Sequence, residues 1–197
     1  MTQSKIAYFG YGSLVNLATL RTNYIAAYPA RISGWSRVWL ERPENIDFHD
    51  RIEDPIALLS VEPNPGTTID GVVIVDHAAN LPEIDEREAF YDRVEVPRPA
   101  LTCSHDLQEA LDMPVFLYAA KPGVVRRDRT VILRSYLDAV AQGFLVTFGQ
   151  EGLLAFDDTT RPRDLPIFED RENPIYPRAV TLTPEERVTI DAVFPPR

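Results

Sequence analysis

Short apolar and aromatic runs are concentrated in the first 120 residues, and most of them end at a glycine, a proline or a charged residue. Runs of this kind are typical of β-strands. The pattern predicts six strands, at Lys5–Phe9, Arg31–Leu40, Ile56–Val61, Gly71–Val75, Tyr91–Val96 and Val115–Tyr118. The turn sequence Pro63-Asn64-Pro65-Gly66 separates the third strand from the fourth and predicts a hairpin or meander there.

Helical spacing dominates the remainder of the chain. Apolar residues recur at helical intervals over Thr130–Gln142, and Gly143 is expected to close that helix. Thr183-Pro184-Glu185-Glu186 is a capping-box sequence that predicts a last helix, ending before Pro195. Short helices are expected at Leu14–Arg21 and within Leu145–Asp158, and a proline-rich loop at 159–178. Because the predicted strands come first along the chain and the predicted helices later, the order of elements favours an α+β fold with a largely closed sheet over alternating β-α-β units.

The charge balance excludes one class of partner. Thirty acidic and 20 basic residues give a net charge of −10, which disfavours nucleic-acid binding because phosphates would be repelled. No apolar stretch reaches the roughly 20 residues that span a bilayer, and no signal-peptide pattern is present, so no membrane partner is expected. Cys103 is the only cysteine, which makes a cytoplasmic location the economical expectation. The scattered His49, His77 and His105 predict no metal site.

The first chemical signal, Phe9-Gly10-Tyr11-Gly12-Ser13-Leu14, directly follows the first predicted strand. A strand that turns into a helix through glycines exposes backbone N–H groups that can hold a carboxylate or a phosphate. Val15 stands where a dinucleotide fingerprint or a nucleophile elbow needs glycine, and no Gly-Lys-Ser/Thr follows. These three motifs are therefore excluded, and an ordinary tight turn remains the alternative interpretation.

The second signal is the acidic segment 81–91, which begins with a helix-favouring proline. At 100° per residue Glu88 shares the apolar face with Ile84 and Tyr91, whereas Arg87 points elsewhere. A carboxylate held against apolar groups has a raised pKa, which suits a general base near pH 7. The alternative is a solvated charged helix on which Glu88 is peripheral.

Together these segments resemble the gamma-glutamylcyclotransferase superfamily, including its ChaC-like and AIG2-like branches. The resemblance covers roughly residues 5–145, in the family's order and spacing. Besides the glycine loop, the matching pieces are Gly66-Thr67-Thr68-Ile69-Asp70-Gly71-Val72-Val73, Ile84-Asp85-Glu86-Arg87-Glu88 with Tyr91, Arg93-Val94-Glu95-Val96, and Tyr136-Leu137 leading to Gly143-Phe144.

The resemblance implies a small mixed β-barrel with flanking helices over residues 1–145, and a C-terminal extension, 146–197, packed on the same domain. It implies cleavage of a γ-glutamyl amide by intramolecular attack to give 5-oxoproline and a free amine, with no metal, cofactor or covalent intermediate. Glu88 would be the general base that accepts a proton from the α-ammonium of the small γ-glutamyl substrate. The substrate-binding residues it implies are Tyr11, Gly12, Ser13, Leu14, Tyr91 and Tyr136.

Two departures from the family leave alternatives open. Ala89 stands where many relatives have glycine, and the segment around 172–178 has no counterpart in the shortest members. That segment is expected to pack as a tail, whereas as a lid it would bring Tyr176 and Arg178 to the substrate. Action on a different γ-glutamyl metabolite and non-catalytic binding of a small carboxylate remain alternative functions, and the oligomeric state is open.

Overall fold

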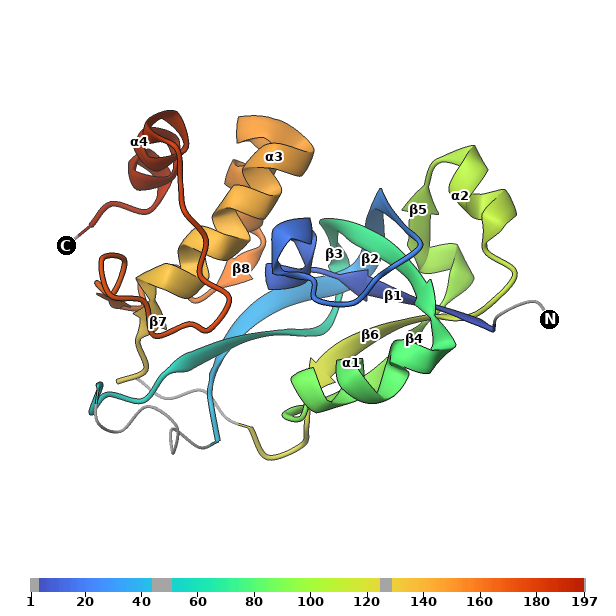
Figure 1. The fold of residues 1–197 in the computed structure, drawn as a ribbon, viewed down its shortest axis with the longest axis horizontal. Coiled ribbons are helices and arrows are strands. Elements are labelled where there is room, and N and C mark those ends of the chain that lie inside the picture. Colours follow the sequence, from blue (N-terminus) through green and yellow to red (C-terminus); the bar gives the residue numbers. More distant parts are fainter. Residues whose placement is uncertain (1–3, 44–50, 125–128, 197) are drawn as a thin grey trace.

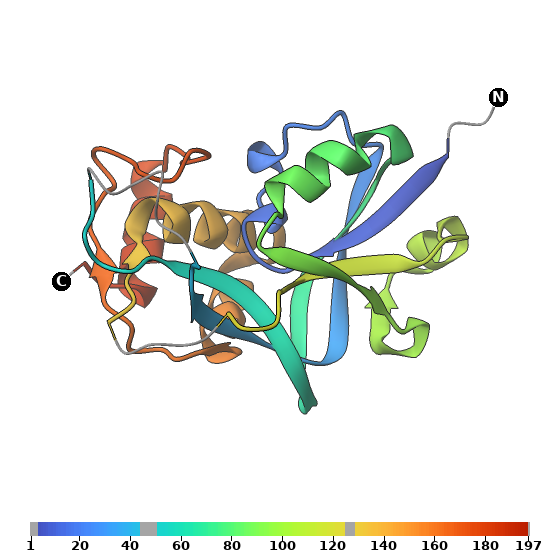
Figure 2. The same ribbon diagram turned by 90° about the horizontal axis from the view of Figure 1, so that it is seen from below.

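One mixed sheet organises the computed structural model, which describes residues 4–43, 51–124 and 129–196 (Figure 1). In this part of the chain seven strands follow the order β4-β6-β1-β3-β2-β5, with β8 paired to β2. The strands are β1 (Lys5–Gly10), β2 (Ala26–Glu41), β3 (Ala57–His77), β4 (Tyr91–Val96), β5 (Leu101–Cys103), β6 (Val115–Ala120) and β8 (Thr160–Arg161). Neighbours are antiparallel except for the parallel pairs β1–β6 and β2–β8. The sheet curls into a half-barrel, which confirms the α+β prediction (Figure 2).

Helices flank the sheet, with α3 and α4 at one end and α2 at the other (Figures 1 and 2). The α-helices are α1 (Leu81–Arg87), α2 (His105–Ala110), α3 (Arg134–Asp158) and α4 (Pro184–Val193). Short 3-10 helices are η1 (Ser13–Val15), η2 (Leu17–Thr19), η4 (Ala78–Asn80) and η5 (Arg98–Ala100). A small separate sheet pairs β7 (Ile132–Leu133) in parallel with β9 (Ile167–Phe168). The predicted capping box of α4 is confirmed, because Thr183 and Glu186 exchange hydrogen bonds between side chain and backbone. Among the described residues, no helix has the length and apolarity needed to cross a membrane.

The prediction of two strands separated by a turn in the β3 region is wrong, because β3 is continuous. The pairing of β2 with β3 shifts register between Ser33 and Trp35, so that residues 64–67 of β3 lie opposite Gly34 alone. Gly34 has a φ of +84°, a left-handed conformation that favours glycine. The bulge explains why Pro65 is tolerated here, since the extra residues have no partner in the ladder and need no N–H donor.

Helix α3 continues through Gly143, so the prediction that this glycine closes the helix is wrong. A Cβ on Gly143 would lie 2.5 Å from the backbone nitrogen of Asn16, which shows that a glycine is needed for close packing rather than for a cap. The helix is instead broken at Gly149, with φ +70° and ψ −169°. The predicted short helix within Leu145–Asp158 is the part of α3 that follows this break. The predicted helix at Leu14–Arg21 is replaced by η1 and η2.

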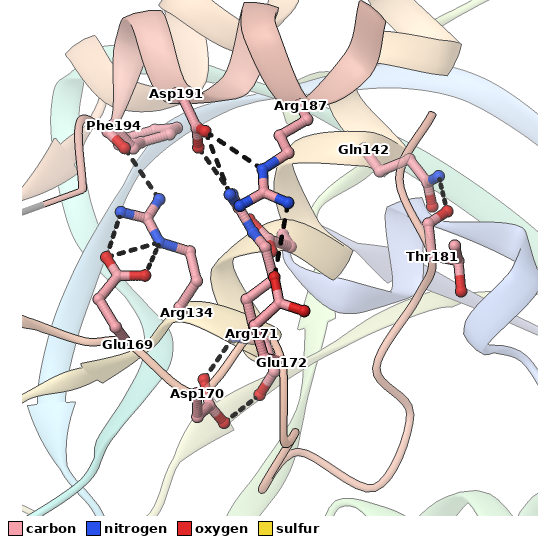
Figure 3. Close-up of polar contacts among 12 residues, drawn as sticks. Arg134, Gln142, Glu169, Asp170, Arg171, Glu172, Thr181, Arg187, Asp191 and Phe194 are labelled. Carbon is pink, nitrogen blue, oxygen red and sulfur yellow. Dashed lines mark hydrogen bonds and ion pairs between the residues drawn. The ribbon is translucent and has the colours of Figure 1, made fainter. Parts of the chain in front are cut away.

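Two arginines fasten the segment after α3 to that helix (Figure 3). Arg134, whose side chain is fully buried, pairs with Glu169 at 2.8 Å between Nη2 and Oε1. Arg171 bridges Asp138 of α3 and Asp191 of α4, with Nη2–oxygen distances of 2.8 and 2.7 Å. The hydrogen bonds from Arg171 lower the pKa of Asp191, because they favour its charged form. The segment that follows α3 is therefore anchored to α3 and α4 through the ion pairs of Glu169 and Arg171.

Candidate active site

A cavity of about 270 Å³ lies where the end of β1, the junction of α1 and β4, the start of α3 and the C-terminal segment meet. All seven residues predicted for the site line it: Tyr11, Gly12, Ser13, Leu14, Glu88, Tyr91 and Tyr136. Sequence positions up to 125 residues apart are thus brought together around one space, and the other lining residues are mainly apolar or arginine. The structure therefore assembles the predicted residues into one candidate site.

The loop after β1 forms one wall of this cavity. The Tyr11 hydroxyl donates to the Tyr118 carbonyl at 2.5 Å, which fixes the side chain against β6. A Cβ on Gly12 would lie 3.0 Å from Leu59 Cδ2 and 3.3 Å from the Tyr136 hydroxyl. Glycine therefore lets the backbone lie close to the tyrosine ring of α3. The turn η1 begins at Ser13, and the N–H groups that start a helical turn have no partner within it.

Arg37 of β2 holds this loop from inside the core. Its Nε donates to the Tyr11 carbonyl at 2.8 Å, and its Nη2 donates to the Asp70 carbonyl. The guanidinium also lies over the rings of Phe144 and Phe156, at 4.8 and 5.1 Å from their centroids. Burial lowers the pKa of Arg37, while the nearby charge of Asp70 opposes that shift. Because a peptide unit is planar and trans, fixing the Tyr11 carbonyl also fixes the direction of the Gly12 N–H.

Glu88 lies directly at the end of α1. The helix ends at Arg87, and Glu88 is its C-cap residue, with its N–H donating to the Ile84 carbonyl at 3.0 Å. The Tyr91 N–H then donates to the Glu88 carbonyl at 2.9 Å, which turns the chain into β4. Tyr91 thus reaches the cavity from a strand, so the prediction that it shares a helix face with Glu88 is wrong. Burial raises the pKa of Glu88, and the charges of Arg87 and Arg178 oppose that rise.

Arg87 is a site residue that sequence reasoning missed. Its Nε lies 3.0 Å from Glu88 Oε1, and its Nη2 donates to the Ser13 hydroxyl at 3.4 Å. Its Nη1 donates to the Thr19 carbonyl at 3.3 Å. The helical periodicity placed this residue on a different face from Glu88. Periodicity gives the direction of a Cβ, however, and not the position of the guanidinium at the end of a long side chain. Arg87 therefore links the base candidate to the glycine loop.

Neutral tyrosines make up much of the remaining wall. Burial is the main reason that the pKa values of Tyr11, Tyr91 and Tyr136 are raised, and the carboxylate of Glu88 adds to the rise. Each hydroxyl is therefore protonated at neutral pH, and those of Tyr11 and Tyr91 donate to backbone carbonyls. The Tyr91 hydroxyl donates to the Leu59 carbonyl at 2.9 Å, which locks its ring against β3.

The C-terminal segment contributes Tyr176, Pro177 and Arg178 to the cavity. The Tyr176 ring meets the Tyr136 ring edge-on, with centroids 5.0 Å apart. Asp170 accepts a hydrogen bond from the Ser135 hydroxyl, and that hydroxyl accepts one from the Tyr176 N–H at 3.2 Å. The segment is thus both packed against α3 and in contact with the site, which combines the two interpretations of the sequence. The sequence raised contacts of Tyr176 and Arg178 with the site only as the lid alternative, since no local pattern decides between a lid and a tail.

No cluster of three or more histidine, cysteine or acidic residues with metal-binding geometry occurs within the described ranges. His77 has its Nδ1 buried beside η4, and His105 begins α2. His49 lies outside the described residues. Glu88 is the one carboxylate among the described residues that line the cavity.

Comparison of the fold identifies similar solved structures. A gamma-glutamyl cyclotransferase matches with a TM-score of 0.59 and 16% sequence identity, over 96% of this chain and 99% of that chain. An uncharacterized human protein matches with a TM-score of 0.58 and 16% identity, over 95% and 98% of the two chains. A yeast gamma-glutamyl cyclotransferase specific to glutathione matches with a TM-score of 0.50 and 15% identity, over 97% of this chain and 96% of that chain.

The same comparisons give no match at the level of sequence. No protein-family model matches this chain, and no curated protein matches it significantly. TM-scores of 0.50–0.59 show a common fold in spite of identities of only 15–16%, while the chemistry has to be argued from the residues that line the cavity.

Proposed function

We propose, from the premise that the chain has the fold of the gamma-glutamyl cyclotransferases, that it cleaves a small γ-glutamyl amide or peptide to 5-oxoproline and a free amine. The observation that carries this proposal is the position of Glu88. It is the one acidic residue among the described residues that line the cavity, and burial raises its pKa. A carboxylate in such surroundings suits proton transfer near neutral pH.

In the proposed reaction Glu88 accepts a proton from the α-ammonium group of the substrate. The freed amine attacks the γ-carbonyl carbon of the same molecule and closes a five-membered ring. The attacking nitrogen gives up a second proton as the bond between that carbon and the amide nitrogen breaks, and Glu88 passes both protons in turn to the leaving nitrogen, which departs as an ammonium group. Because the nucleophile is tethered to the electrophile, the enzyme has mainly to fold the substrate and manage these two proton transfers.

The cavity walls suggest how the glutamyl unit is held. The N–H groups of residues 11–14 and the Ser13 hydroxyl are the proposed donors to its α-carboxylate. Arg87, which contacts both Ser13 and Glu88, adds positive charge on that side. Tyr91 and Tyr136 are proposed to bound the folded carbon chain. The α-ammonium then lies beside Glu88, where its proton is removed.

The test is release of 5-oxoproline from a panel of γ-glutamyl dipeptides, γ-glutamyl amines and glutathione, compared between wild type and Glu88→Gln. Glutamine keeps the shape but cannot accept the proton, so we expect turnover to fall about 10²- to 10⁴-fold. Glu95→Gln, on the exposed side of β4, is the matched control and keeps wild-type turnover. Full turnover by Glu88→Gln contradicts the assignment of the base, and no turnover of any compound by wild type contradicts the reaction.

A further inference from the structure

A second cavity, of about 410 Å³, adjoins the first. Three residues line both spaces and form the wall between them: Leu14, Arg87 and Arg178. The remaining lining residues of the second cavity are Tyr8, Leu20, Arg21, Thr22, Glu83, Ile84 and Glu86. A substrate seated beside Glu88 thus has space on the other side of this shared wall, and the wall carries two cations.

The two cations of the shared wall differ in their partners. Arg87 is committed to Glu88, Ser13 and Thr19. Arg178, in contrast, has a buried Nε without a hydrogen-bond partner, although the side chain as a whole is only partly buried and its charge acts to lower the pKa of Glu88. A buried N–H donor without a partner costs free energy, and a carboxylate that accepts a hydrogen bond from it offsets the cost.

The backbone around Arg178 is held in place independently of its side chain. Arg21 donates to the Pro177 carbonyl at 3.3 Å, and Ser135 accepts from the Tyr176 N–H at 3.2 Å. The edge-on contact of Tyr176 with Tyr136 adds a third fixed point. The fold therefore keeps Arg178 at the boundary of the two cavities, both of which it lines.

We propose that Arg178 determines specificity by binding a carboxylate carried by the leaving amine, so that γ-glutamyl amino acids and peptides are preferred to γ-glutamyl amines without a carboxylate. This inference rests on the proposed function. Glu83 and Glu86 also line the second cavity, and both are exposed. Their charge disfavours an anion deep in that space, so the favourable position for the carboxylate is at the shared wall.

The experiment measures binding separately from turnover. Calorimetric titrations in a Glu88→Gln background compare γ-glutamyl-alanine with γ-glutamyl-ethylamine, whose leaving amine is the same except for the missing carboxylate. We expect the first compound to bind about tenfold to a hundredfold more tightly, the range of one charged hydrogen-bonded pair. Adding Arg178→Met should bring the two dissociation constants to within about threefold of each other. Arg98→Met, at an exposed arginine of η5, is the control and keeps the preference.

Each other outcome overturns a defined part of the reasoning. A preference that survives Arg178→Met refutes the contact with the leaving amine. An equal loss of affinity for both compounds also refutes it, because that result places Arg178 on the glutamyl unit. Turnover is then followed in protein with Glu88 intact. An Arg178-dependent preference without 5-oxoproline release refutes the proposed reaction alone, and binding of neither compound contradicts both.

Discussion

The sharpest test of the site is to remove the cation beside Glu88 and leave Glu88 itself intact. In Arg87→Met an apolar chain of similar reach replaces a guanidinium whose Nε lies 3.0 Å from the carboxylate. The two side chains are only 11% and 14% exposed, so solvent screens the pair weakly. Burial raises the pKa of Glu88, and Arg87 is the largest influence that opposes this. Without Arg87 the pKa must rise further.

The size of the rise follows from the distance between the charges. An opposite charge within about 4–6 Å lowers the pKa of a carboxyl group by about 1–3 units. Two units, the middle of that range, correspond to about 2.7 kcal/mol in favour of the protonated form. Only deprotonated Glu88 can accept the substrate's proton, so activity is lost as pH falls through its pKa. In Arg87→Met we therefore expect this acid limb about 1–3 pH units higher than in wild type.

The measurement is kcat/KM for 5-oxoproline release between pH 5 and 9 for wild type, Arg87→Met and a control. Arg93→Met serves as the control because Arg93 pairs with Asp85 at 3.3 Å on the half-exposed side of β4 and does not line the cavity. Recovery of Arg87→Met activity toward pH 9 separates a shifted base from an unfolded protein. An acid limb that stays at its wild-type position, or moves to lower pH, would refute the reasoning.

Two further substitutions test how the fold positions the site. Gly143→Ala places a Cβ 2.5 Å from the backbone nitrogen of Asn16. We therefore expect the free energy of unfolding, measured in urea, to fall by about 1–3 kcal/mol. Gly66→Ala, whose new Cβ meets nothing nearer than 4.0 Å, is its control, and equal effects of the two would contradict the packing argument. Arg37→Met removes the hydrogen bond to the Tyr11 carbonyl, which directly precedes Gly12. We expect KM to rise about tenfold with a smaller change in kcat, the effect of one misplaced hydrogen bond; an unchanged KM in steady-state kinetics would rule this role out.

Local sequence was sufficient where a local interaction decides the structure. The strand Tyr91–Val96 was predicted with its observed bounds, because Pro97 cannot continue it. The capping box at Thr183 identified the start of α4, since both of its hydrogen bonds lie within one turn. Ser13 and Glu88 were predicted to share a site, and they line the same cavity. That prediction rested on the resemblance to a known family and not on periodicity.

Long-range packing accounts for the predictions that were wrong. Gly143 carries the local signature of a helix end, but its role is set by Asn16, 127 residues away, against which the helix packs. The proline-rich stretch of β3 reads as a turn because the bulge opposite Gly34 is a property of the paired strand. Arg178 was placed near the substrate only under the lid alternative, because no local pattern shows that the anchored C-terminal segment brings it to the cavity.

The cavity has walls from widely separated parts of the chain, and this has a consequence for synthesis on the ribosome. The glycine loop and Glu88 are made well before Tyr176 and Arg178. Because chains emerge N-terminus first, a nascent protein carries its proposed base in an unfinished site until the segment around Tyr176 docks on α3. A product truncated before Tyr176 would therefore retain Glu88 while lacking one wall of the cavity around it.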